Sequence, residues 1–259
     1  MTGPAPPWVE PRRTPVAGRL DPERHPEWWL WAVAGAGGLV LVALVLRGWL
    51  PSPGAAPVAG HSGHHAAGGS GLAPHAVAWA AMIAVMAPLI TANVRHAALR
   101  SPRRARAAVM GDVVAGWAGM WAGAAVLLGL IAWLLTSTAG ELGAIALLTA
   151  TAIGWQCSAL KRRSVARCHR LLAPPLDRAR SRRACRRYGV GLGRDCVVSC
   201  WPLMALMAVA AHDPVVVLSS VGVAWYERRR RPHHDPATRG ACLVLAATGA
   251  TAAAVAFLT

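Results

Sequence analysis

Two apolar stretches of this sequence carry sulfur side chains at regular spacing. Met82 and Met86 are four residues apart, and Cys196, Cys200 and Met204 follow one another at the same interval. Residues four apart lie on the same face of an α-helix. Thioethers and thiolates are soft ligands, which select Cu(I) over harder cations. The two stretches therefore predict two helix faces that hold a soft metal ion, with copper as the expected metal.

The same sulfur side chains have a second interpretation. Methionine fills irregular gaps in protein cores, and a free cysteine behaves as a small apolar residue. Both residue types therefore occur in helical cores without binding a metal. The spacing alone leaves packing and metal binding open.

Histidines form a further group of candidate ligands. His61, His64 and His65 lie in a linker rich in Pro, Gly and Ala. Histidine tracts of this kind bind divalent copper, nickel or zinc. His75 and His212 are expected at the same face of the molecule. We expect this face to collect metal ions above the sulfur site; the alternative is a solvated linker whose histidines bind nothing.

Long uncharged apolar runs must position these side chains. The chain is 55% hydrophobic, and backbone polar groups inside a bilayer need partners within their own helix. We therefore predict an all-α, polytopic transmembrane helix bundle over residues 28–259, after a disordered cytoplasmic tail over residues 1–27. The expected spans are 28–50, 75–94, 109–136, 142–160, 188–211, 214–226 and 240–258. The span 214–226 is shorter than the roughly 17 residues usually needed, so six spans result if it does not cross.

The positive charges indicate an orientation. All Lys and Arg residues except Arg47 and Arg194 lie before residue 28 or in the stretches 95–106, 161–187 and 227–239. Short loops rich in Lys and Arg stay on the cytoplasmic side. We expect a multi-pass protein of the bacterial inner membrane with a cytoplasmic N-terminus and an external C-terminus. The net charge of +16 then faces anionic lipids, not nucleic acid.

This orientation predicts that the sulfur atoms meet at the same depth. The run that begins at His75 descends from the external face, and the run that ends at Ala211 rises toward it. Met82 and Met204 are each seven residues from that face, a depth of about 10 Å at the helical rise. Met86 and Cys200 both lie about 16 Å deep by the same rise. The sulfur atoms meet if these two helices touch.

No catalytic motif is present. The sequence has no nucleophile elbow, phosphate loop, zincin motif or pair of carboxylates within one run, so an enzyme is not expected. A redox enzyme that uses Cys196 and Cys200 is disfavoured, because side chains one helical turn apart have poor geometry for a disulfide. Cys157, Cys168 and Cys185 lack zinc-finger spacing, and we expect free thiols in a reducing cytosol.

Three blocks carry a resemblance to a known family. Residues 79–88 read WAAMIAVMAP, residues 156–168 read QCSALKRRSVARC, and residues 196–204 read CVVSCWPLM. In order and spacing they resemble the bacterial family of predicted metal-binding integral membrane proteins, a family of unknown function. The chain departs from the family pattern where Ser164 and Ser199 replace cysteines, which reduces the number of sulfur ligands.

The resemblance implies a metal site built from the sulfur residues that remain: Met82, Met86, Cys168, Cys196, Cys200 and Met204. With the residue analysis, it predicts a membrane protein that binds copper and takes part in its transport or delivery. The alternative is a non-catalytic structural subunit of a larger membrane complex. In that case methionine and cysteine only pack, and the basic stretch 161–187 docks a membrane protein partner or lipid.

Overall fold

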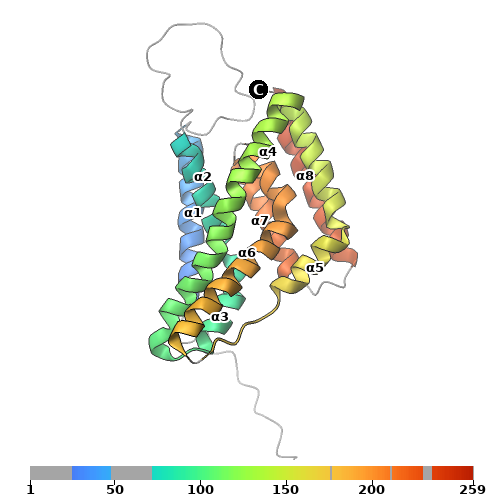
Figure 1. The fold of residues 1–259 in the computed structure, drawn as a ribbon. Coiled ribbons are helices and arrows are strands. Elements are labelled where there is room, and N and C mark those ends of the chain that lie inside the picture. Colours follow the sequence, from blue (N-terminus) through green and yellow to red (C-terminus); the bar gives the residue numbers. More distant parts are fainter. Residues whose placement is uncertain (1–24, 48–71, 176, 211, 230–234, 259) are drawn as a thin grey trace, which may run out of the picture.

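The computed structural model describes residues 25–47, 72–175, 177–210, 212–229 and 235–258, and these residues form helices without any strand. Figure 1 shows an elongated bundle in which most helices run along the long direction of the molecule. The helices are α1 (Trp28–Leu46), α2 (Leu72–Val85), the 3₁₀ turn η1 (Ala87–Ile90), α3 (Thr91–Leu99), the 3₁₀ turn η2 (Arg103–Ala105), α4 (Arg106–Gln156), α5 (Ala159–Cys168), α6 (Arg178–Val209), α7 (Pro214–Arg229) and α8 (Asp235–Leu258).

The second expected span is not one regular helix. It was expected to run from His75 to Val94, but α2 ends at Val85 and the chain continues through η1 into α3. Pro88 lies in η1. Proline has no N–H group, and its ring clashes with the carbonyl group four residues earlier, so it breaks a regular helix. The tighter turn is closed by a hydrogen bond from the Leu89 amide to the Met86 carbonyl oxygen, 3.0 Å long.

The third and fourth expected spans are the two arms of α4. Gly140 divides α4 with a φ of 70°, a left-handed conformation that glycine adopts without steric cost. Figure 1 shows that the chain reverses direction there and returns beside α8. The returning arm ends at Gln156 and not at the expected Leu160, because Ser158 begins α5 by accepting a hydrogen bond from the Lys161 amide at 3.1 Å.

Glycines bring α4 and α6 into close contact. A Cβ atom at Gly189 of α6 would lie 2.1 Å from the carbonyl oxygen of Val113, and one at Gly116 of α4 would lie 2.4 Å from that of Arg186. Small residues let helix backbones approach each other within a membrane bundle. This contact fixes α6 against the first arm of α4.

Ion pairs join the charged ends of the helices. Arg167 of α5 pairs with Asp195 of α6 at 2.9 Å, and Lys161 pairs with Glu227 of α7 at 3.0 Å. Asp112 at the start of α4 pairs with Arg182 of α6 at 3.0 Å. These ion pairs therefore join α5 to α6 and to α7, and α4 to α6.

Four helical stretches are long and apolar enough to cross a membrane: Trp28–Leu46, His75–Leu99, Arg103–Gln156 and Arg180–Val209. Large apolar side chains on these stretches face outward, such as Leu46 and Val126, which are 81% and 77% exposed. A count of seven spans stays a prediction. Residues 1–24 of the tail expected over residues 1–27 lie outside the described residues, as do His61, His64 and His65.

Candidate metal centre

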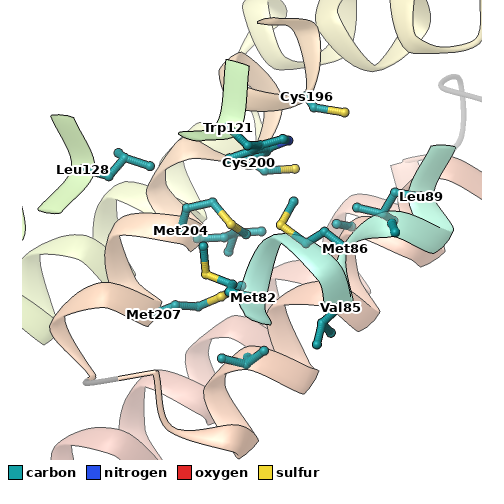
Figure 2. Packing of buried hydrophobic residues seen from close by; sticks show 14 of the residues in the cluster. Met82, Val85, Met86, Leu89, Trp121, Leu128, Cys196, Cys200, Met204 and Met207 are labelled. Carbon is teal, nitrogen blue, oxygen red and sulfur yellow. The ribbon is translucent and has the colours of Figure 1, made fainter. Parts of the chain in front are cut away.

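Sulfur side chains from two helices converge in the core. Figure 2 shows Met82 and Met86 pointing toward Cys200, Met204 and Met207 of α6. All five side chains are buried, and the four methionines have no exposed surface. We call these five residues the methionine cluster. Met207 is not among the ligands expected from the sequence, although it follows Met204 by three residues and so lies on nearly the same helix face.

The position of Met82 and Met86 follows from the break at Pro88. Met82 lies in the last turn of α2, and Met86 immediately follows this helix. The Met86 amide is shared between the carbonyl oxygens of Met82 and Ile83, both at 3.2 Å. The tightening of the helix into η1 therefore begins at the residue whose thioether enters the cluster.

A proline in α6 is supported by a tryptophan at the level of the cluster. Pro202 lies inside α6, and its missing N–H leaves the Val198 carbonyl oxygen without its usual helical donor. The indole Nε1 of Trp155, on the returning arm of α4, donates a hydrogen bond to that oxygen at 3.0 Å. The Trp155 ring also packs edge-on against Trp201, with ring centroids 5.6 Å apart. These contacts hold the segment that carries Cys200 and Met204.

The surroundings of the methionine cluster are apolar. Trp121 lies beside Cys200, and Val85, Leu89 and Leu128 line the same region (Figure 2). Within the described ranges, no three His, Cys, Asp or Glu side chains come close enough together to hold a metal ion. The donors available here are therefore mainly thioethers, which suit Cu(I) and not a hard cation.

A strained histidine closes the C-terminal end of α6. His212 is 2% exposed and has a φ of 61°, and its amide donates a hydrogen bond to the Met207 carbonyl oxygen at 2.8 Å. Its ring packs edge-on against Trp79, with centroids 5.2 Å apart, and neither ring nitrogen has a hydrogen-bond partner among the described residues. Burial, with a smaller effect of His75, lowers the pKa of His212 to about 4. The imidazole is therefore neutral at pH 7, with a nitrogen lone pair free to bind a metal.

Cys196 does not join the methionine cluster. Its sulfur points away from the methionines (Figure 2), and the Arg228 Nη2 atom lies 2.5 Å from it. The neighbouring Cys196 thiol and burial raise the pKa of Cys168, the last residue of α5. The structure therefore divides the expected sulfur ligands into two groups.

The other histidine and cysteine residues considered in the sequence are not part of either group. His75 lies at the first turns of α2 with an exposed side chain. Cys157 is exposed, and Cys185 is buried elsewhere along α6; all six cysteines are free thiols. No sequence signal pairs Cys168 with Cys196, because the packing of α5 on α6 sets that contact.

A comparison with protein-family models gives one finding. The model for a family described as PpoB2, copper chaperone, matches residues 76–252, well over half of the chain. The matched region contains the methionine cluster, Cys168, Cys196 and His212. No curated protein and no solved structure matches the chain.

Proposed function

Since the chain belongs to the PpoB2 copper chaperone family, we propose that it binds Cu(I) in the methionine cluster and passes the ion to another molecule. The observation that carries this proposal is the convergence of five buried sulfur side chains from two separate parts of the chain (Figure 2). Packing alone does not require so many sulfur atoms at one point. Thioethers and a thiolate are the soft ligands that select Cu(I).

The charge of the methionine cluster suits a monovalent ion. Thioethers are neutral, and the Cys200 thiol becomes a thiolate when it binds a metal. Cu(I) with one thiolate and thioether ligands has no net charge, which avoids the high cost of an unpaired charge in an apolar environment. Cu(II) in the same place would leave one positive charge unbalanced. The cluster therefore favours the reduced ion.

His212 supplies a donor at one end of the cluster. Its amide donates a hydrogen bond to the Met207 carbonyl oxygen, and its ring packs on Trp79, three residues before Met82. A buried polar group without a partner is destabilising, as is a non-glycine residue with a positive φ. We infer that copper binds this imidazole before it reaches the thioethers of Met207 and Met82. The metal then supplies the partner that the buried imidazole lacks.

We place the bundle in the bacterial inner membrane, with the start of α6 at the cytoplasmic face and His212 at the external face. The four apolar helical stretches and the distribution of Lys and Arg support this orientation. Anionic lipids then contact the basic helix ends. Because binding and transfer of a metal ion need no covalent chemistry, we propose no enzymatic activity.

The test is Cu(I) binding by the full-length protein, purified in detergent and kept anaerobic. The double variant Met82→Leu/Met204→Leu removes two thioethers and conserves volume, a change that usually costs less than about 1.5 kcal/mol per site. We expect it to bind one Cu(I) fewer per chain than the wild type. Met110→Leu, which changes a partly buried methionine of α4 outside the cluster, is the matched control. If the double variant and the control bind equal amounts of copper, the methionine cluster does not bind Cu(I) and its side chains only pack the core.

A further inference from the structure

The thiols of Cys168 and Cys196 form a second pair of soft ligands, separate from the methionine cluster. They come from α5 and α6 and are 3% and 1% exposed. Arg228 lies beside both of them, because it contacts the Cys196 sulfur and lines a cavity together with Cys168. Along α6, Cys196 is one turn before Cys200 and two turns before Met204. At the helical rise, Cys196 lies about 12 Å from the level of Met204.

Arg228 gives this pair a charge partner. Its Nη2 atom lies 2.5 Å from the Cys196 sulfur, and its Nη1 atom donates to the Leu89 carbonyl oxygen. None of the Asp or Glu side chains in the described ranges forms an ion pair with Arg228. A partly buried guanidinium group that lacks a carboxylate partner is costly unless another anion balances it. The anion that the fold offers is a thiolate.

We propose that Cys168 and Cys196 form a second Cu(I) site, a two-coordinate bis-thiolate whose negative charge is balanced by Arg228. This inference rests on the proposed function, because it needs Cu(I) as the cargo. Copper does not change its oxidation state. Binding forms two Cu–S bonds and releases the thiol protons to solvent, which leaves a complex of net charge −1 beside one guanidinium. The site as a whole is then neutral, like the methionine cluster.

A cavity adjoins Cys168, one thiol of this pair. It has a volume of about 360 Å³, and Cys168, His169 and Arg228 line it. Asn93 on its wall donates to the Cys168 carbonyl oxygen at 3.1 Å and also contacts the Tyr188 hydroxyl at 2.6 Å, which fixes the end of α5. Thiolates exchange Cu(I) readily with other soft ligands. In the orientation we propose, this end is cytoplasmic, so the site exchanges Cu(I) with a small cytosolic thiol.

The experiment titrates full-length protein in detergent with Cu(I) against a chromophoric Cu(I) chelator. Cys168→Ser should lose one Cu(I) per chain, whereas Cys185→Ser, which changes another buried thiol, should bind as much as the wild type. Arg228→Met should weaken the affinity of this site at least about tenfold, because it removes a unit charge next to the complex. Arg228→Lys should retain most of the affinity. Full copper binding by Cys168→Ser would overturn the inference.

A second measurement identifies the ligands of copper at the Cys168–Cys196 site while both thiols stay in place. The variant Met82→Leu/Met204→Leu, loaded with one Cu(I), should show two sulfur ligands by X-ray absorption, and added glutathione should remove the ion. Copper bound by nitrogen or oxygen ligands would contradict the proposal. If only Cys168→Ser binds less copper, the proposed site in the methionine cluster is wrong and the site at the thiol pair is supported. If only Met82→Leu/Met204→Leu binds less copper, the site at the thiol pair is wrong and the site in the methionine cluster is supported.

Discussion

The contact between α4 and α6 provides a sharp test of how the fold positions the sulfur ligands. In Gly189→Ala, the new Cβ atom would lie 2.1 Å from the Val113 carbonyl oxygen, whereas ordinary contacts begin at 3.4 Å. The two helices must therefore separate by about 1.3 Å, and overpacking of this kind typically costs about 1–3 kcal/mol. Backbone atoms make the clash, so a change of side-chain rotamer cannot relieve it.

The displacement should reach the copper ligands. Gly189 is 11 residues before Cys200 on the same helix, and α6 moves as a rigid element if it moves at all. A shift of about 1 Å in one of two facing sets of ligands weakens a metal site that needs defined geometry. We therefore expect both a lower thermal unfolding temperature and a lower affinity for Cu(I).

Gly119→Ala on α4 is the matched control. A Cβ atom there meets nothing within 4 Å, and alanine is favoured over glycine in a helix by about 0.5–1 kcal/mol. The control should unfold at the same or a higher temperature and bind copper like the wild type. If Gly189→Ala behaves like the control in both assays, the close contact between α4 and α6 does not position the site.

Three further predictions concern other buried polar groups. Lys161→Met should destabilise the protein by about 3–5 kcal/mol, because it leaves Glu227 without its partner at 3.0 Å; adding Glu227→Gln should recover much of the loss in thermal unfolding. Trp155→Phe should cost about 1–3 kcal/mol, because the Val198 carbonyl oxygen loses its donor, and hydrogen exchange should rise in that part of α6. The pKa of His212 is about 4 in the folded protein and 6.5 in the unfolded chain, so between pH 6.5 and pH 4 mainly the unfolded state takes up a proton. The free energy of unfolding of the copper-free protein should therefore decrease by up to about 3 kcal/mol as the pH falls from 6.5 to 4. His212→Phe should remove this part of the pH dependence of unfolding, and an unchanged profile would show that the imidazole is not buried.

The helices could be predicted because length and hydropathy are local properties. Each of the seven apolar runs contains a helix in the structure, and the described residues contain no strand. The break in the second run was missed because a single proline such as Pro88 is often accommodated as a kink in a membrane helix. The conformation of Gly140 within α4 was missed because its left-handed φ depends on how the two arms of α4 pack.

The common depth of the sulfur side chains could be predicted from helical rise, whereas neither the contact between the two runs nor the separation of Cys196 could. Helical rise places Met86 level with Cys200, and Figure 2 shows them side by side. Cys196 has the same spacing from Cys200 as Met204 has, so spacing cannot distinguish them. Its partners, Cys168 and Arg228, lie 28 residues before it and 32 residues after it, and only the packing of α5 and α7 on α6 brings them together. Binding of copper to either group stays a prediction.

The proposed function depends on direct binding of Cu(I) by methionine thioethers. X-ray absorption at the copper edge of selenomethionine-labelled protein measures this, because each coordinating methionine then places a selenium atom in the first shell of the metal. We use the Cys168→Ser variant loaded with one Cu(I), so that only the methionine cluster is occupied. We expect copper–selenium scattering at bonding distance that decreases in Met82→Leu/Met204→Leu. Bound copper without any selenium neighbour would contradict it.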